Sequence, residues 1–319
     1  MLLSVIVPVY KTQSTLDACM ESVASQIGGR GEIVMVDDGS PDASAAMCDQ
    51  WAMRDKRVRV VHKANGGLSE ARNAGIDASR GDMLMFVDSD DTIAPDTIAP
   101  LVDIMTGNPQ VDILEFPVTK VWEGRREDFL SFQSPLAVYD DMRDYWLGCK
   151  AYCHTFACNK IYRRRLFAAE AVRFPVGRVF EDAYTLPRLL SRARRVATTG
   201  RGEYRYVQNP LGITATAGAR ELAMLLDAHI DVLGRLLNEA APTARIDGAL
   251  RDYYIHVVDI QLSLSELTGE KPSIPSRLVT LSHLSAVHKV KALMVNTLGL
   301  SALCRANRLM RILFPRKRR

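Results

Sequence analysis

The sequence lacks any apolar run long enough to cross a membrane. A spanning helix needs roughly 18 to 20 consecutive apolar residues, and no stretch of these 319 residues reaches that length. The apolar start, MLLSVIVPVY, also lacks a basic segment and a cleavage site, and a proline interrupts it. We therefore expect a buried strand there, and a protein that is made and kept in the cytoplasm.

Glycine and proline are not enriched and aromatic content is modest, so long disordered segments are not expected. The six cysteines show no spacing typical of a secreted disulfide framework, and we expect reduced thiols. Three of them gather with a histidine in Cys149-x3-Cys153-His154-x3-Cys158. This spacing fits no common zinc site, and small buried hydrophobic side chains are the favoured interpretation.

Acidic residues are absent from the last part of the chain. No aspartate or glutamate follows Glu270, whereas residues 271–319 contain 11 lysines and arginines. The first 270 residues carry 30 basic and 37 acidic side chains, so the net charge of +4 conceals an acidic body and a strongly basic end. We expect the basic end to bind an anionic surface.

Strand and helix patterns alternate in the first third of the chain. Apolar runs predict strands at Leu2–Val9, Glu32–Val36, Val58–His62 and Met83–Val87. Helical spacing between them predicts helices at Ser14–Gln26, Asp42–Arg54 and Ser69–Ser79, with Ser14, Asp42 and Ser69 as N-caps. This order predicts an α/β fold with a mostly parallel sheet, which binds ligands outside the carboxyl ends of its strands.

The pattern changes twice further along the chain. A mixed region runs from about Val111 to Asn209 and begins with a strand-like stretch at Val111–Val121. From Gly218 onward the pattern is nearly all helical. The expected helices are Ala219–Glu239, Ala244–Leu267 and a last segment from about Ser285.

Polar loops follow all four strands that are predicted in the first third. They are Pro8-Val9-Tyr10-Lys11, Asp37-Asp38-Gly39-Ser40, Lys63-Ala64-Asn65-Gly66-Gly67 and Asp88-Ser89-Asp90-Asp91. Because the carboxyl ends of parallel strands meet at one edge, these loops should converge. An isolated Asp-x-Asp is more often a solvated turn. Beside three other polar loops, it favours a site for Mg²⁺ or Mn²⁺, which bind carboxylates and phosphates together.

These loops belong to a longer series of motifs. The series is SVIVPVYK at 4–11, EIVMVDDGSPD at 32–42, NGGLSEARNAGIDASRGDMLMFVDSDD at 65–91, FACNKIYRRRLF at 156–167 and FEDAYTLPRLL at 180–190. In this order and spacing the chain resembles family 2 of the inverting glycosyltransferases, which have the GT-A fold. The resemblance implies a GT-A domain whose nucleotide-sugar-binding part is residues 1–110 and whose acceptor-binding part is residues 111–215. Residues 216–319 would form a helical C-terminal region with a basic amphipathic tail.

The resemblance implies a nucleotide-sugar donor, expected to be a UDP-sugar. Its binding residues would be Pro8, Val9, Tyr10, Asp38, Asn65, Arg72, Asp88 and Ser89. In family members the position of Asp38 hydrogen-bonds the base, and Arg72 would offer a cation to base or phosphate. Asp90 would ligate a divalent metal, Mn²⁺ or Mg²⁺, that neutralises the diphosphate leaving group. The alternatives are simple packing for Tyr10 and a charge on the helix surface for Arg72.

A second acidic site of the family matches Glu181-Asp182. Inversion needs a carboxylate that takes the acceptor hydroxyl proton while that oxygen attacks the anomeric carbon. We expect Asp182 to be this base, with Glu181 supporting it. The alternative is that the pair stabilises the N-terminus of a helix Ala183–Leu190. Asn159 and Lys160 match a family pair on the acceptor side, where they either touch substrate or brace the Glu181 loop.

The processive members of the family carry a Gln-x-x-Arg-Trp signature after the base and have membrane spans. Residues 188–195 lack that signature, which predicts the transfer of a single sugar. Two other functions remain open. A haloacid dehalogenase-like phosphatase would use Asp88 as nucleophile, although its motif ordinarily follows the first strand of the domain. A non-catalytic protein that binds membrane surfaces or carbohydrate is the second.

The basic end contains a candidate amphipathic helix at Leu303–Phe314. Its apolar side would be Leu303, Ala306, Leu309, Met310, Leu313 and Phe314, opposite Arg305, Arg308 and Arg311. With Arg316-Lys317-Arg318-Arg319 after it, this helix suits an anionic membrane surface, and packing on the protein body is the alternative. No aromatic residues interleave with these charges, so nucleic acid is not expected.

We expect the acceptor to be a saccharide, lipid-linked, at the inner face of the cell membrane, in cell-surface polysaccharide synthesis. The enzyme would then be peripheral on that membrane. The sequence is also compatible with a homo-oligomer, and it does not identify the sugar, the linkage or the metal that is preferred.

Overall fold

The computed structural model describes residues 2–168, 172–209, 212, 216–238 and 245–313. It divides into two compact units, which are described separately. The first unit is Met1–Tyr145 with His154–Pro210, and the second is Trp146–Cys153 with Leu211–Arg319. None of the helices in the described ranges combines the length and the hydropathy that crossing a bilayer requires.

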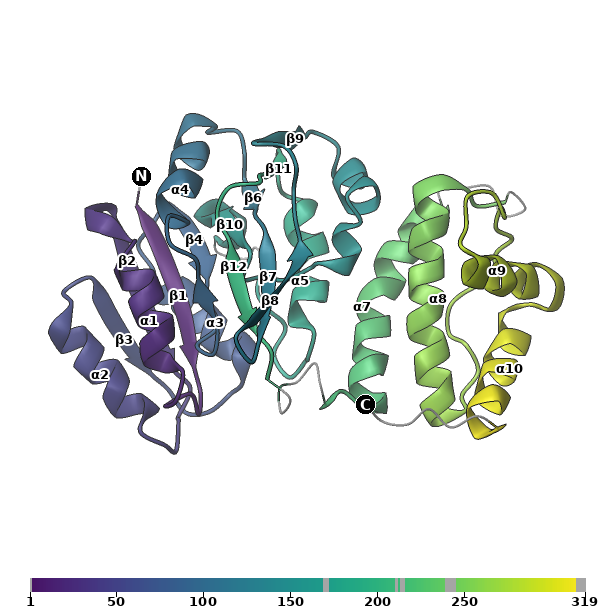
Figure 1. The fold of residues 1–319 in the computed structure, drawn as a ribbon, viewed down its shortest axis with the longest axis horizontal. Coiled ribbons are helices and arrows are strands. Elements are labelled where there is room, and N and C mark those ends of the chain that lie inside the picture. The colour runs from purple at the N-terminus through teal and green to yellow at the C-terminus, as the bar shows by residue number, and fades with distance from the viewer. Residues whose placement is uncertain (1, 169–171, 210–211, 213–215, 239–244, 314–319) are drawn as a thin grey trace. The chain divides into compact units, whose positions relative to one another are not determined.

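The first unit begins with parallel strands that are joined by helices (Figure 1). The strands are β1 (Leu3–Val9), β2 (Gly31–Asp37), β3 (Val58–His62) and β4 (Met83–Phe86), and they pair in the order β3-β2-β1-β4. The connecting helices are α1 (Leu16–Ala24), α2 (Ser44–Arg54) and α3 (Leu68–Ala78). The elements predicted for this part of the chain are therefore confirmed to within about two residues at each end.

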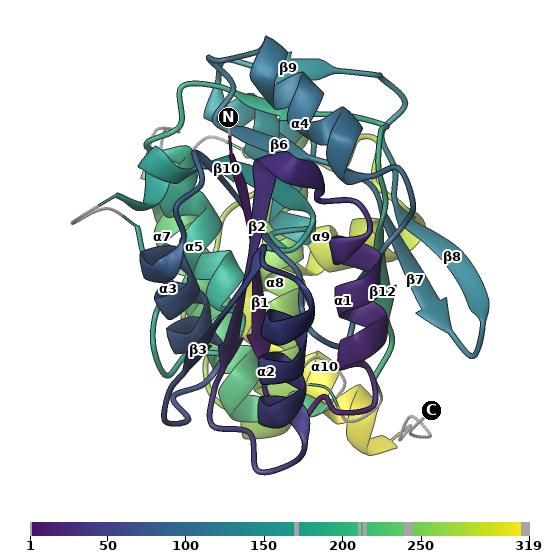
Figure 2. The same cartoon turned by 90° about the vertical axis from the view of Figure 1, so that its left-hand side faces the viewer.

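Helices cover both faces of these strands. Figure 2 shows α3 on one side of the sheet and α1 on the other. Alternate β1 residues such as Val5 and Val7 share a core with Leu16 of α1. On the opposite face, a Cβ added to Gly75 of α3 would lie 2.3 Å from the Ile6 side chain, so glycine lets this helix approach closely. Burial from both sides explains why β1 and β2 are buried along their whole length and are mostly apolar.

The predicted N-caps are wrong. The three helices follow Thr15, Ala43 and Gly67, and none of these caps its helix with a side chain. Asp42 does accept a hydrogen bond from the Ser44 amide at 3.2 Å, but the helical conformation begins one residue later than a capping aspartate requires. Ser69 lies inside α3, because the positive φ of Gly67 starts that helix earlier.

The sheet is mixed beyond its first four strands. It continues through β10 (Lys160–Arg163), β6 (Ile113–Glu115), β11 (Val196–Thr198) and β9 (Ala137–Tyr139). β10 runs antiparallel to both β4 and β6, so the parallel arrangement is confined to parts of the sheet. A second sheet contains, in order, β5 (Thr92–Ile93), β12 (Tyr204–Val207), β7 (Val118–Trp122) and β8 (Arg125–Leu130). The single strand expected at Val111–Val121 is therefore divided between β6 and β7.

The remaining helices of the first unit are α4 (Ile98–Gly107) and α5 (Glu181–Leu190). Single helical turns of this unit lie at Gly28–Arg30 and Arg164–Phe167, the turn Asp144–Gly148 runs from the first unit into the second, and the turn Ala151–Cys153 belongs to the second unit. The second unit contains α7 (Ala219–Asn238), α8 (Gly248–Thr268), α9 (Ala286–Leu298) and α10 (Leu300–Leu313). Its helix α8 packs against both α7 and α10. The helical C-terminal region predicted from the sequence is confirmed.

Candidate active site

The loop after β2 is organised by the buried carboxylate of Asp38. Its oxygens accept hydrogen bonds from the backbone amides of Gly66 at 3.0 Å and Gly67 at 2.7 Å, and from the Lys63 ammonium at 2.7 Å. Gly67 has a φ of 87°, which favours glycine, and this lets its amide turn toward Asp38. The Asn65 side chain donates to the Asp38 carbonyl at 3.0 Å. The loop after β2 and the loop after β3 are thus joined by hydrogen bonds.

The end of β1 lies beside the Asp38 loop. The backbone amide of Asp38 donates to the Val9 carbonyl at 2.9 Å, and Pro8 pairs in register with Val36 of β2. Val9 is fully buried, whereas the Tyr10 side chain is 42% exposed. The half-exposed ring of Tyr10 is available to stack on a planar group such as a nucleotide base.

Arg72 of α3 joins the loop after β4 to the start of α5. Its buried guanidinium donates to Asp88 at 2.8 Å and also to Glu181, although 109 residues separate Arg72 from Glu181. Burial lowers the pKa of Arg72, but the charges of Asp88 and Glu181 outweigh that effect and raise the pKa above its ordinary value. The alternative of a charge on the helix surface is therefore wrong. The contact also brings the two acidic motifs into one network.

The three aspartates after β4 lie in different surroundings. Asp91 is buried and accepts hydrogen bonds from the Tyr204 hydroxyl and the Val207 amide, each at 2.7 Å. These bonds anchor the loop to β12, and no sequence signal indicated them. Asp90 is only partly buried. Burial, followed by the charge of Asp88, raises the pKa of Asp90 above its ordinary value.

The environment of Asp88 and Asp90 fits a divalent cation. Their charges repel each other and Asp90 is partly desolvated, so a cation would relieve the repulsion that raises the Asp90 pKa. Across the described ranges, no three His, Cys, Asp or Glu side chains are arranged to hold an ion by themselves, which includes the cysteine-rich segment 149–158. Mg²⁺ usually takes one or two protein carboxylates together with substrate phosphates. Ser89, which separates the two aspartates in the sequence, is buried.

The second acidic pair opens helix α5. Phe180 has a left-handed φ of 55°, and the helix begins directly after it at Glu181, two residues before the expected start. Burial raises the pKa of both Glu181 and Asp182, and the charge of Arg72 opposes this effect. The Ala183 amide donates to Asp182 at 2.7 Å. A raised pKa makes the ionised carboxylate a stronger base, which suits a proton acceptor.

Asn159 and Lys160 are fully buried around Glu115, a residue that the sequence did not single out. The Lys160 ammonium and the His154 ring each lie 2.8 Å from one Glu115 oxygen, and the Tyr145 hydroxyl donates to the other at 2.7 Å. Burial opposes ionisation, but the charges of Lys160 and His154 outweigh it and lower the pKa of Glu115 to about 2. Both side chains brace the interior around Glu115 and neither is exposed, so the structure gives no contact surface for a substrate at these two side chains; their placement on the acceptor side stays a prediction.

Replacing Glu115 by alanine should lower the free energy of unfolding by about 3–5 kcal/mol, because Lys160 is left as an unpaired buried charge. The pKa of about 2 lies below the ordinary 4.5, so the ionised Glu115 stabilises the fold above pH 4.5 and this effect is lost as the pH falls toward 2. Denaturant unfolding at several pH values measures the loss of stability in the variant and the pH dependence of the unaltered chain. The exposed Glu127→Ala variant should change stability by less than about 0.5 kcal/mol; equal losses in the two variants would contradict the assignment.

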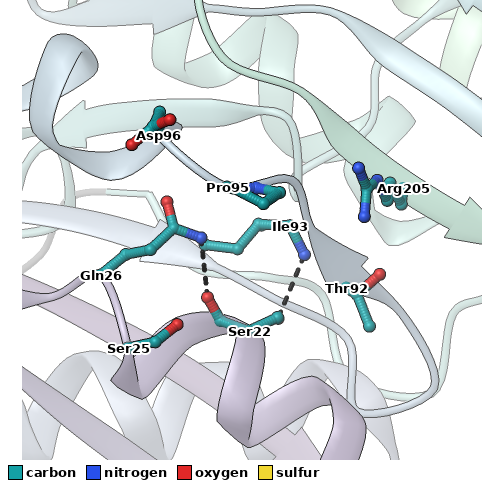
Figure 3. A pocket seen from close by; sticks show the side chains of 8 residues that line it. All are labelled: Ser22, Ser25, Gln26, Thr92, Ile93, Pro95, Asp96 and Arg205. Carbon is teal, nitrogen blue, oxygen red and sulfur yellow. Dashed lines mark hydrogen bonds between the residues drawn. The ribbon is translucent and has the colours of Figure 1, made fainter.

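A cavity beside α1 and β5 contains none of the predicted site residues (Figure 3). It measures about 430 Å³ and is lined by Ser22, Ser25, Gln26, Thr92, Ile93, Pro95, Asp96 and Arg205. The Gln26 amide donates to the Ser22 and Ala94 carbonyls and accepts from the Thr97 amide. The polar groups of Gln26 therefore hold the segment after β5 and the start of α4 in place, and they are not free to bind a ligand.

The chain is similar in sequence to known glycosyltransferases. The family described as "Glycosyl transferase family 2" matches residues 4–169. The uncharacterized glycosyltransferase EpsJ of Bacillus subtilis is 33% identical over 217 residues, which cover 67% of this chain and 63% of EpsJ. The minor teichoic acid biosynthesis protein GgaA of Bacillus subtilis is 28% identical over 64% of this chain and 46% of GgaA. The chain thus spans less than two thirds of either relative.

A solved structure shares the fold. The crystal structure of S. aureus TarS 1-349 in complex with UDP-GlcNAc has a TM-score of 0.62 and 20% sequence identity. The match covers 97% of this chain and 88% of that one. This likeness confirms the GT-A fold that the sequence motifs implied.

Proposed function

Because the chain belongs to glycosyl transferase family 2, we propose that it transfers one sugar from a nucleotide sugar to a saccharide acceptor with inversion. The contact that carries this proposal is the one between Arg72 and the carboxylates of Asp88 and Glu181. It joins the donor-side loop to the acidic pair on α5, as a single transfer site requires. Residues 1–110 would bind the donor and residues 111–215 the acceptor.

The proposed donor is a UDP-sugar. The UDP-GlcNAc complex of TarS supports this choice, since that protein shares the fold. The base would stack on Tyr10 beside the loop that Asp38 and Asn65 hold. Mn²⁺ or Mg²⁺ would be held by Asp90, with Asp88 beside it. The metal would neutralise the charge that develops on the departing diphosphate.

Asp182 is the proposed general base. Glu181 is occupied by Arg72, whereas no cation of the described residues lies within ion-pair distance of Asp182. The acceptor hydroxyl oxygen would attack the anomeric carbon from the face opposite the diphosphate. As that carbon–oxygen bond forms, the bond to the diphosphate breaks and the hydroxyl proton passes to Asp182. Arg72 would keep Glu181 ionised and hold α5 against the loop that carries Asp88.

The proposed acceptor is a lipid-linked saccharide in cell-surface polysaccharide synthesis. The name of the relative GgaA supports a role in such a polymer, and the basic end supports a site at the inner face of an anionic membrane. The predicted amphipathic helix is partly described, as α10. Leu303 is buried, whereas Leu309, Met310 and Leu313 are exposed. Phe314, the basic residues 316–319 and the side chains of residues 311 and 312 lie outside the described part of the chain.

The phosphatase alternative is contradicted by the family match. Asp88 follows the fourth strand along the chain, not the first, and one of its oxygens is bound by Arg72. A non-catalytic binding protein remains testable, because it predicts no loss of function when Asp90 or Asp182 is replaced.

Release of UDP from a panel of UDP-sugars should depend on a divalent metal. We expect EDTA to abolish it and Mn²⁺ or Mg²⁺ to restore it, because the metal neutralises the leaving diphosphate. Asp90→Ala should lower the rate at least about 100-fold, and Asp103→Ala, an exposed position on α4, should leave it unchanged. Coupled detection of UDP measures each rate. Full activity in EDTA, or in Asp90→Ala, would overturn the proposed role of the metal.

A further inference from the structure

Helix α9, which Figure 1 labels in the second unit, carries exposed apolar side chains on one side. Val287, Val290 and Leu293 are 64%, 60% and 52% exposed, and their spacing of three residues places them on one side of the helix. We call these three residues the α9 face. The same helix buries Ala292 and Val295 instead. A helix on a globular protein normally buries its larger apolar side chains and exposes polar ones, so this arrangement needs a partner.

The α9 face is held in its outward orientation by contacts on the other side of the helix. The Asn296 side chain accepts from the Val279 amide at 2.8 Å and donates to the Val279 carbonyl at 2.7 Å. The Lys291 ammonium pairs with Asp259 of α8. These bonds fix the rotation of α9 about its own axis, so the exposed valines and leucine are a preset surface of the second unit.

The helix that carries the α9 face and the helix after it are basic. Neither α9 nor α10 contains an acidic residue, and Lys289, Arg305 and Arg308 are exposed on them. A second copy of this chain that packed through the same face would bring like charges together. An anionic lipid surface instead offers acyl chains to the apolar side chains and phosphates to the cations, so it satisfies both requirements.

We propose that α9 lies in the surface of an anionic lipid membrane, with Val287, Val290 and Leu293 inserted beneath the headgroups. Its 13 residues span only about 20 Å at 1.5 Å each, which is too short to cross a core of about 30 Å. The helix therefore lies along the membrane. Helix α9 would add an apolar membrane contact to the charged contact of the basic tail. It would hold the enzyme at the membrane that carries the proposed lipid-linked acceptor, and in that respect the inference rests on the proposed function.

The test is binding of the full chain to phosphatidylcholine vesicles with and without phosphatidylglycerol, measured by cosedimentation. The variant V287S/V290S/L293S should bind the anionic vesicles at least about tenfold more weakly, because three apolar insertions are lost. The control M53S/V176S replaces exposed apolar residues of the first unit and should bind like the unaltered chain. Added salt should weaken binding by the unaltered chain, since the cations contribute.

Removal of residues 309–319 distinguishes the contribution of the basic tail to vesicle binding from that of α9. This truncation leaves the buried Leu303 in place. The shortened chain should bind more weakly than the full chain, and the α9 substitutions should weaken it further. Unchanged vesicle binding by the triple variant would overturn the proposal. So would a dimer of the unaltered chain that the same substitutions dissociate, since the face would then bind a second copy.

UDP release in the absence of any acceptor keeps this inference distinct from the proposed function. The triple variant should release UDP at the rate of the unaltered chain, which also shows that it is folded. If the unaltered chain releases no UDP from any nucleotide sugar yet binds vesicles through α9, the transfer reaction is wrong and the membrane inference stands. If the unaltered chain releases UDP but binds no vesicles, the membrane inference is wrong and the proposed transfer reaction stands.

Discussion

Replacing Asp182 by asparagine should lower kcat for sugar transfer by about 10²- to 10⁴-fold, the contribution typical of a general base. The amide keeps the size of the carboxylate but cannot take the proton of the acceptor hydroxyl. Glu181 cannot substitute easily, because its carboxylate is bound by Arg72. KM for the donor should change little, since Asp182 lies outside the loops that are proposed to bind the nucleotide. Steady-state kinetics with a saturating donor measures this effect.

The pH dependence gives a second readout of the same residue. Burial raises the pKa of Asp182 above its ordinary value of 3.8. The base acts only when it is ionised, so kcat/KM should fall as the pH drops through this raised pKa. The Asp103→Asn variant is the matched control and should retain the activity and the profile of the unaltered chain. An Asp182→Asn enzyme within threefold of the unaltered chain would show that another group takes the proton.

Replacing Arg72 by methionine should impair both stability and catalysis. Asp88 and Glu181 would lose their shared cation inside the protein, and breaking a buried ion pair costs about 3–5 kcal/mol of unfolding free energy. Without that positive charge, the pKa of Asp182 should rise further, because the charge of Arg72 now opposes the effect of burial. The acid limb of the kcat/KM profile should therefore move to higher pH, with the rate at neutral pH reduced.

The pH profile distinguishes this role of Arg72 from a merely structural one. A structural role would reduce the folded fraction but leave the acid limb where it is. Arg72→Lys should be intermediate, since one ammonium cannot bridge two carboxylates as a planar guanidinium does. Arg188→Met, at an exposed position on α5, should change neither the stability nor the profile. An unshifted profile in folded Arg72→Met would refute the proposed coupling to Asp182.

The sequence determined the elements of the nucleotide-binding half and the place of its loops. Hydrophobic periodicity is local, because each strand or helix carries its own buried side chains, and so β1 to β4 and α1 to α3 were predictable from short windows. Parallel strands must end at one edge, which made the joining of Asp38 to the loop that carries Asn65 predictable as well. Strand pairing is not local. The antiparallel position of β10, which pairs Ile161 with Met85, depends on contacts across 76 residues.

Only the tertiary structure decided what individual polar side chains do. The sequence left Arg72 between a surface charge and a nucleotide contact, and the fold buries it against two carboxylates, which excludes the surface charge. It likewise turns Asn159 and Lys160 inward to Glu115. A buried charge pairs with an opposite charge that the fold brings near it, because an unpaired buried charge destabilises the folded state. That partner is set by the packing of distant segments, which no local pattern of residues records.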